Sequence, residues 1–233
     1  SVDFLESIGV FGYKIASADL KNIPLQKYIA KKNKQIFLST GGSTMKDIER
    51  ACKAILPINK KLAILHCTSS YPVNICEMNL KVIQNLKKKF PKLLIGISDH
   101  ESGIDAAAIA YMMGARIFEK HFTLDHSWKG TDHSFSLMPE GLRKLVRNLN
   151  RIPKMLGDGK KKVYHSEKEP VKKMGKSIVA SKNLKKGQRL SASDLAFKSP
   201  GGGLPPYFYT KILKRVLKKG LNKDDLFHLK YLK

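Results

Sequence analysis

The chain has 233 residues, and its 44 Lys and Arg against 19 Asp and Glu give a formal net charge of +25. A hydrophobic content of 42% is enough to bury a core, which excludes a wholly disordered chain. No apolar run approaches the roughly 18–20 residues that a membrane-spanning helix needs, so no membrane partner is expected.

The first two-thirds of the chain alternates short apolar runs with amphipathic segments. The predicted strands are Tyr13–Ile15, Gln35–Ser39, Leu62–His66, Leu93–Ile97 and Ala115–Glu119, and the predicted helices are Thr44–Ile55, Leu80–Phe90, Ile104–Met113 and Pro139–Leu156. This alternation predicts parallel βα units, either in a doubly wound sheet or in a β/α barrel. Five strands fall short of the eight in a complete barrel, which suggests a fragment whose barrel strands begin upstream.

The pattern changes after residue 156. Residues 157–175 are rich in Gly, Lys and Glu and are predicted to be a linker. Residues 176–233 are predicted to form a small β-rich domain, with short strands and turns at Ser177–Ala180, Leu184–Gln188 and Leu195–Phe197 and a Gly-rich loop at 200–203. The expected organisation is therefore a βα domain over 1–156, a linker, and a second domain.

Polar residues follow all five predicted strands, at the edge where ligands gather in parallel α/β folds. They include Lys14, Ser17 and Asp19; Ser39; Ser69 and Tyr71; Ser98 and His100; and His121. His100 and His121 lie one βα repeat apart, which is compatible with a divalent-metal site or with a pair of hydrogen-bonded loop histidines. Lys14 is expected to contact a bound anion or to extend toward solvent. Residues 39–43 form either an anion cradle or an ordinary βα turn.

The basic residues are spread over the whole chain. Residues 157–233 carry 20 Lys and Arg against 6 Asp and Glu, and residues 1–156 carry 24 against 13. No aromatic-rich basic motif or helix-turn-helix accompanies them, so a solvated Lys-rich surface is preferred to a nucleic-acid partner. Cys52, Cys67 and Cys76 show no CxxC spacing and are predicted to be core residues of a cytoplasmic protein.

Six motifs in order carry a family resemblance. They are Tyr13–Ser17 (YKIAS), Leu38–Gly42 (LSTGG), Leu65–Pro72 (LHCTSSYP), Gly96–His100 (GISDH), Glu119–Thr123 (EKHFT) and Gly130–His133 (GTDH). Together they resemble the sialic acid synthase family, and Lys176–Lys233 resembles its C-terminal antifreeze-like (SAF) domain. The resemblance implies the last five βα units of a TIM (β/α)8 barrel, a linker and a SAF domain.

The resemblance also implies an activity, the condensation of phosphoenolpyruvate with an N-acetylmannosamine-like aminosugar to a sialic acid, with release of phosphate. His100 and His121 match the family's metal ligands for Mn²⁺ or Mg²⁺, and Lys14 and Ser17 match positions that hold phosphoenolpyruvate. Ser39, Ser69 and Ser98 match positions lining the same pocket, and Tyr71 matches a sugar-side tyrosine. Asp19 stands where the family often has Glu and is predicted to be catalytic together with Lys14, His100 and His121.

Two departures from the family leave alternatives open. The acidic, lysine and threonine contacts of the family's first three strands have no match here. The family's SAF loop commonly reads Arg-Pro-Gly, and this chain has Ser199 before Pro200 and Gly201. A domain-swapped homodimer is implied for the full-length enzyme, although the Ser199 change removes one usual cross-subunit contact. The alternatives are a synthase of another nonulosonic acid, such as legionaminic acid or a spore-coat sugar, or a non-catalytic fragment.

Overall fold

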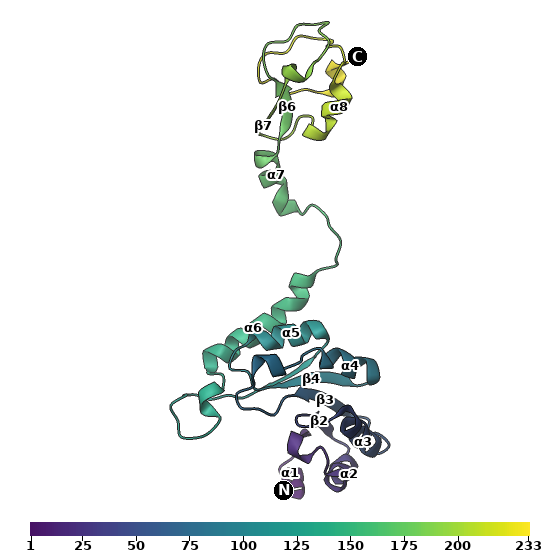
Figure 1. Ribbon diagram of the computed structural model, residues 1–233, viewed down its shortest axis with the longest axis vertical. Coiled ribbons are helices and arrows are strands. Elements are labelled where there is room, and N and C mark those ends of the chain that lie inside the picture. Colours follow the sequence, from purple (N-terminus) through teal and green to yellow (C-terminus); the bar gives the residue numbers. More distant parts are fainter. The chain divides into compact units, whose positions relative to one another are not determined.

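The computed structural model describes residues 1–233 and divides into two compact units, Ser1–Asp158 and Gly159–Lys233, each taken by itself here (Figure 1). The first unit contains one sheet of five parallel strands that are neighbours in the order in which they occur along the chain. The strands are β1 (Gly12–Ile15), β2 (Gln35–Ser39), β3 (Leu62–Cys67), β4 (Leu94–Asp99) and β5 (Ile117–Lys120). All five predicted strands are confirmed within two residues at either end, and they form a half-barrel.

The sheet is strongly curved. In a flat sheet, strands β1 and β5 would lie about 19 Å apart, since neighbouring strands are spaced by about 4.8 Å. Yet Lys14 on β1 and Glu119 on β5 form an ion pair, with 3.3 Å between Nζ and Oε2. Their side chains can meet only because the two edge strands curve toward each other. The inner face of the sheet is therefore concave.

Helices connect the strands and cover the outer face of the sheet (Figure 1). They are α1 (Val2–Ser7), α2 (Ile23–Lys31), α3 (Met45–Ile55), α4 (Val82–Lys89), α5 (Asp105–Met113) and α6 (Pro139–Leu156). The four predicted helices are α3 to α6. Helix α3 begins with a capping box: the Thr44 hydroxyl accepts a hydrogen bond from the Asp47 N–H, and the Asp47 carboxylate accepts one from the Thr44 N–H. Hydrogen bonds to the Asp47 carboxylate from the Thr44 N–H, the Thr44 hydroxyl and Arg50 lower the pKa of Asp47 to about 2.

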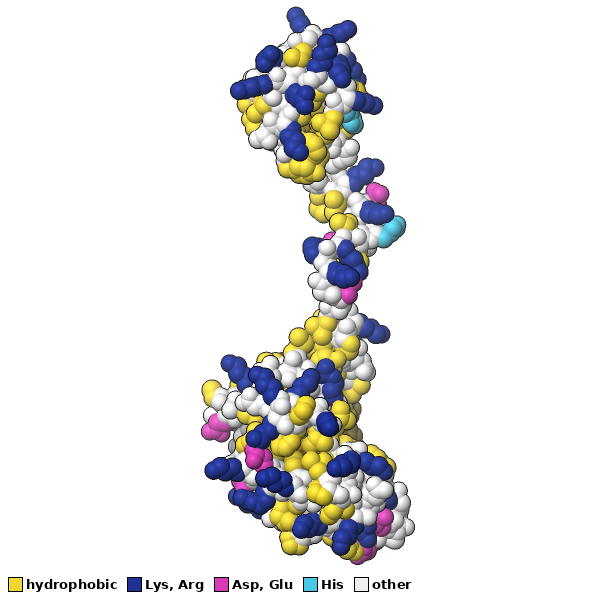
Figure 2. Space-filling view, turned by 90° about the vertical axis from the view of Figure 1, so that its right-hand side faces the viewer, with side chains coloured by type: hydrophobic (Ala, Val, Ile, Leu, Met, Phe, Trp, Pro, Cys, Tyr) yellow, Lys and Arg dark blue, Asp and Glu magenta, His cyan; other side chains and the backbone are white.

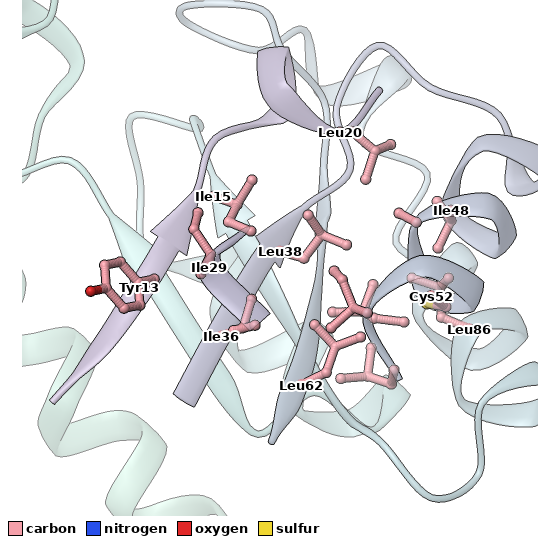
Figure 3. Close-up of a cluster of buried hydrophobic side chains, with 14 of the residues drawn as sticks. Tyr13, Ile15, Leu20, Ile29, Ile36, Leu38, Ile48, Cys52, Leu62 and Leu86 are labelled. Atoms are coloured by element: carbon pink, nitrogen blue, oxygen red, sulfur yellow. The ribbon is translucent and has the colours of Figure 1, made fainter. Parts of the chain in front are cut away.

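The main core lies between the sheet and these helices (Figure 3). Ile36 and Leu38 of β2 and Ile64 of β3 point outward and are fully buried. They pack with Ile48 and Cys52 from one face of α3. Alternate residues on the same strands face the concave side, so the packing of the core determines which side chains remain for a ligand.

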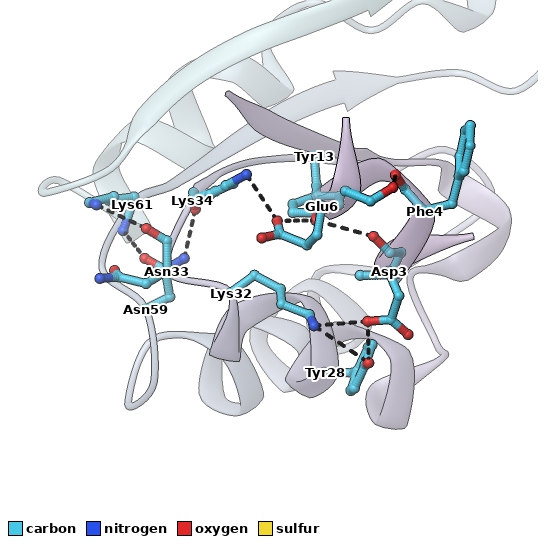
Figure 4. Close-up of polar contacts among 12 residues, drawn as sticks. Asp3, Phe4, Glu6, Tyr13, Tyr28, Lys32, Asn33, Lys34, Asn59 and Lys61 are labelled. Carbon is cyan, nitrogen blue, oxygen red and sulfur yellow. Dashed lines mark hydrogen bonds and ion pairs between the residues drawn. The ribbon is translucent and has the colours of Figure 1, made fainter. Parts of the chain in front are cut away.

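Helices α1 and α2 were not predicted. Helix α1 has only six residues, too few to show an amphipathic repeat. It is held by polar contacts instead: Tyr13 donates to Glu6, and Tyr28 donates to Asp3 at 2.5 Å (Figure 4). Burial, then the Glu6 hydrogen bond, raises the pKa of Tyr13 to about 12. These contacts fix α1 against β1 and α2.

The second unit has its own core. It contains α7 (Lys168–Met174), β6 (Ser177–Ala180), β7 (Leu195–Lys198) and α8 (Tyr209–Ile212), with β6 and β7 antiparallel. Its fully buried side chains are Ile178, Leu190, Ile212 and Phe227. Of the three segments predicted as short strands and turns, two are strands, and Leu184–Gln188 is a turn that begins with an isolated bridge between Leu184 and Leu221. The stretch predicted as a linker contains α7, whose charged and Pro-containing sequence carries no hydrophobic repeat.

The remaining elements are single 3₁₀ turns. They are η1 (Ser17–Asp19), η2 (Ile75–Glu77), η3 (His133–Phe135), η4 (His165–Glu167), η5 (Ala192–Asp194), η6 (Pro206–Phe208) and η7 (Leu229–Tyr231). Cys52 and Cys67 are buried as predicted, but Cys76 is exposed. The prediction for Cys76 was wrong because this residue lies in η2, a surface turn after β3, and not in a packed element.

Lys and Arg side chains are dispersed over the surface of each unit, with few Asp and Glu among them (Figure 2). This distribution agrees with the solvated Lys-rich surface preferred from the sequence. None of the helices combines the length and the apolar character that crossing a membrane requires.

Candidate active site

A cavity of about 250 Å³ opens at the carboxyl ends of the five strands. It is lined by Lys14, Ala16, Ser17, Ser39, Cys67, Tyr71, Ser98, Glu119, Lys120, His100 and His121. These residues come from all five strands or from the segments that follow them. The topology of the sheet thus brings together side chains that are more than a hundred residues apart in the sequence.

Lys14 provides a positive charge in this cavity. Its Nζ lies 3.3 Å from Oε2 of Glu119, and the two side chains are 33% and 38% exposed. Because both remain partly hydrated, this pair contributes little to the stability of the fold. An incoming anion can therefore compete with Glu119 for the ammonium group.

Three serine hydroxyls face the cavity beside Lys14. The Ser17 Oγ accepts the N–H of Gly41 at 2.9 Å. Ser39 is 1% exposed, and its Oγ has no hydrogen-bond partner. A buried hydroxyl without a partner loses free energy unless a ligand or a water pairs with it. Ser39, with Ser17 and Ser98 nearby in the lining, therefore indicates a polar ligand at this position.

His100 and His121 stand one residue beyond the ends of β4 and β5. Their ring centroids are 5.1 Å apart. The Nδ1 of His100 lies 2.9 Å from the carbonyl oxygen of Thr68. In the neutral ring this nitrogen must donate, which assigns the free lone pair to Nε2. Burial lowers the pKa of His100, so that the ring is neutral at neutral pH.

An acidic residue and a tyrosine lie beside the ring of His121. Its Nδ1 lies 3.5 Å from an Oδ2 of Asp132. The ring of Tyr71 lies 4.1 Å from that of His100 and 5.8 Å from that of His121, measured between centroids. Tyr71 is 53% exposed, so it stands at the mouth of the cavity. Partial burial raises its pKa, which keeps the phenol protonated.

The two imidazoles fit a divalent cation as its protein nitrogen ligands. His100 keeps a free lone pair, and its other ring nitrogen contacts a backbone carbonyl, as is usual behind metal-bound histidines. No group of three or more His, Cys, Asp or Glu side chains gathers in ligand geometry. Other ligands would therefore be oxygen atoms of water or substrate.

Seven of the nine predicted site residues line the cavity: Lys14, Ser17, Ser39, Tyr71, Ser98, His100 and His121. Ser69 lines an adjacent recess instead, with its Oγ 3.8 Å from the Sγ of Cys67. Asp19 lies at the end of η1, where its carboxylate accepts a hydrogen bond from Asn22 at 3.2 Å. The structure does not bring Asp19 into the lining of the cavity.

Besides Ala16, which directly follows β1, three lining residues were not predicted as site residues: Cys67, Glu119 and Lys120. Each lies at the end of a strand, where strand alternation decides the side that a residue faces. Glu119 pairs in register with Ser98 on β4, so a correct register would have identified it. Cys67 was interpreted as a core residue because it follows an apolar strand.

The curved βα sheet, with its polar strand ends, defines a barrel-type α/β enzyme fold followed by a small β domain. A sequence model of the NeuB family matches residues 1–161, and one of the SAF domain matches residues 175–232. The chain belongs to the NeuB family and ends in a SAF domain. The resemblance and the fold class predicted from the motifs are confirmed.

Curated relatives have related names. The chain is 40% identical over 229 residues to N,N'-diacetyllegionaminic acid synthase of Campylobacter jejuni, covering 97% of this chain and 68% of that protein. It is 36% identical over 219 residues to N-acetylneuraminate-9-phosphate synthase of Homo sapiens, covering 93% of this chain and 61% of that protein. The chain thus spans about two-thirds of the length of these relatives.

Solved structures share the fold. N-acetylneuraminic acid synthetase from Leptospira borgpetersenii, solved with citrate, is 40% identical, with a TM-score of 0.65 over 73% of this chain and 59% of that chain. The spore coat polysaccharide biosynthesis protein spsE of Bacillus subtilis is 29% identical, with a TM-score of 0.62 over 100% of this chain and 70% of that chain.

Proposed function

We propose that the protein takes part in nonulosonic acid synthesis by condensing phosphoenolpyruvate with an N-acetylated aminosugar and releasing phosphate. The observation that carries this proposal is the single cavity in which a lysine, three serine hydroxyls and two imidazoles from five strands converge. Such a set suits an anionic substrate beside a divalent cation. The names of the relatives support a sialic acid-type product.

Lys14, Ser17, Ser39 and Ser98 would hold phosphoenolpyruvate. The ammonium of Lys14 attracts its negative charges, and the unpartnered Ser39 hydroxyl supplies a hydrogen bond in a buried position. Binding an anion would draw Lys14 away from Glu119 and leave that carboxylate free to accept a proton. These groups bind and orient the anion and exclude water from it.

His100 and His121 would hold the cation, and two nitrogen ligands favour Mn²⁺ over Mg²⁺, which prefers oxygen. When bound, the ion supplies Lewis acidity that polarises the aldehyde of the aminosugar. Tyr71, at the mouth of the cavity, would contact the sugar. The catalytic role of Asp19 and the substrate contact of Ser69 stay predictions.

The proposal includes two candidates for the sugar substrate. The 40% identity to a legionaminic acid synthase favours a di-N-acetylated sugar as the second candidate. Ser199 stands before Pro200 in the SAF loop, and its hydroxyl donates to the Met174 carbonyl at 3.2 Å. It therefore offers no guanidinium for sugar recognition. A cytoplasmic, domain-swapped homodimer is part of the same proposal, and a non-catalytic role is the outcome if no sugar is turned over.

The test is phosphate release by the full gene product with phosphoenolpyruvate, Mn²⁺ and a panel of N-acetylated aminosugars. We expect turnover with one of them, and a loss in kcat/KM of at least about a hundredfold for His100→Ala and His121→Ala. The matched control is His165→Ala, an exposed histidine in η4, which should retain full activity. Activity that is unchanged in both site variants would contradict the metal assignment.

A further inference from the structure

Directly beside the two histidines lies a buried ion pair. Lys120 Nζ is 2.8 Å from an Oδ2 of Asp99, and the two side chains are only 6% and 2% exposed. Each residue immediately precedes one of the histidines, because Asp99 comes before His100 and Lys120 before His121. Asp99 and Lys120 are also register partners on β4 and β5.

Lys120 makes a second contact on the far side of His100. Its Nζ also donates to the carbonyl oxygen of Glu101. The other carboxylate oxygen of Asp99 accepts the N–H of Glu101 at 2.9 Å. Residues 99 and 101, which flank His100, are thus both tied to the residue that precedes His121. We call this arrangement the Lys120 strap.

Apart from ring contacts with Tyr71 and Phe135, the histidine rings have one polar contact each outside this strap. His100 is anchored by the carbonyl of Thr68, which follows β3. The Nδ1 of His121 lies 3.5 Å from Oδ2 of Asp132, and the Asp132 side chain is 52% exposed. The strap is the buried side-chain link between the two strand ends that carry the rings.

The chemistry of the pair also favours a positioning role. Desolvating two charges costs as much as their attraction returns, so a buried ion pair gives little net stability compared with apolar residues of the same size. What it gives is a fixed geometry, since three hydrogen bonds hold Lys120, Asp99 and Glu101 together. Groups that hold metal-bound residues in place commonly change metal affinity when they are removed.

We propose that Lys120 is a positioning residue, which through the Lys120 strap sets the separation of the His100 and His121 imidazoles and so the affinity of the site for a divalent cation. This inference rests on the proposed function in one respect, the binding of a cation by these two rings. Lys120 itself need not touch the cation or the substrate.

The decisive variant is the double substitution Asp99→Asn with Lys120→Met in the full gene product. Lys120→Met alone leaves a buried carboxylate unpaired and can unfold the protein, whereas the double variant leaves no uncompensated charge. The matched control is Lys89→Met, which removes another lysine–carboxylate pair, with Glu49, between α3 and α4 and away from the cavity lining. Mn²⁺ binding is measured by electron paramagnetic resonance without substrate, together with the thermal midpoint.

We expect the double variant to bind Mn²⁺ about ten to a hundred times more weakly at a nearly unchanged midpoint, and Lys89→Met to bind like the parent. Affinity of the double variant within twofold of the parent would overturn the proposal. If the parent itself binds no Mn²⁺, the proposed metal site is wrong. Hydrogen exchange of residues 98–104 in the metal-free protein then tests whether the Lys120 strap holds the segment around His100. Faster exchange in the double variant supports the strap, and unchanged exchange refutes it.

Discussion

Gly41, in the turn after β2, is the position where the smallest change should disturb the candidate site most. A methyl group at this position would lie 2.0 Å from the Ser69 Oγ and 3.0 Å from both the Cys67 Sγ and the Ser17 Oγ. Gly41→Ala therefore pushes on three side chains at or beside the cavity while leaving the charges of the site unchanged.

The size of the effect follows from these contacts. The Ser69 hydroxyl must leave its rotamer, at a cost of about 0.5–1.5 kcal/mol. The Ser17 Oγ must retreat from the Gly41 N–H, which weakens a 2.9 Å hydrogen bond worth about 1 kcal/mol. A total cost of about 1.5–2.5 kcal/mol at the place where the anion is proposed to bind corresponds to roughly tenfold to sixtyfold weaker binding of phosphoenolpyruvate.

The assay is isothermal titration of the full gene product with phosphoenolpyruvate, and the matched control is Gly42→Ala. Gly42 has a φ of +62° and nothing within 4 Å of an added Cβ, so this variant carries backbone strain of about 1–2 kcal/mol without a collision. We expect Gly42→Ala to lower the thermal midpoint and to leave the affinity within about twofold. The reasoning is refuted if Gly41→Ala binds phosphoenolpyruvate as tightly as the parent.

Three further predictions concern stability. Burial lowers the pKa of His66 below its ordinary value of 6.5, so below pH 6.5 the unfolded chain binds a proton more readily than the folded chain. The free energy of unfolding should therefore fall as the pH drops below 6.5. In urea titrations His66→Asn should reduce this dependence on pH, and a variant with the same pH dependence as the parent would contradict the prediction. Thr44→Ala removes the cap of α3 and should cost about 1 kcal/mol in urea unfolding, whereas no loss would show that the capping bonds contribute nothing. Leu86→Ala, at a fully buried position, should cost about 2–5 kcal/mol, against less than about 0.5 kcal/mol for the exposed Leu94→Ala, and equal losses would contradict the assigned core.

The sequence was sufficient for the strands of the half-barrel. The run Leu62–Cys67, for example, is buried along its whole length, so it appears as a short apolar segment without alternation. Helix α2 was not predicted, and its start depends on an Asn22 cap and a proline. The short helix α1 depends on long-range contacts such as Tyr28 with Asp3.

A residue of the candidate site could be predicted where its position along a strand was enough to place its side chain at the cavity. Lys14 and the two histidines follow from the repeat of βα units, which places strand ends at one edge. Glu119 and Lys120 adjoin His121, but their roles depend on the curvature that brings Glu119 to Lys14 and on the register that pairs Lys120 with Asp99. Neither curvature nor register can be read from apolar periodicity.

The central claim is that phosphoenolpyruvate and a divalent cation share the cavity at the strand ends. It is tested most directly by a crystal structure of the full gene product with Mn²⁺ and phosphoenolpyruvate, using anomalous scattering to locate the manganese. We predict a manganese peak between the imidazoles of His100 and His121, with phosphoenolpyruvate against Lys14 and the Ser39 hydroxyl. Manganese bound away from both histidines, or phosphoenolpyruvate bound outside this cavity, would contradict the account.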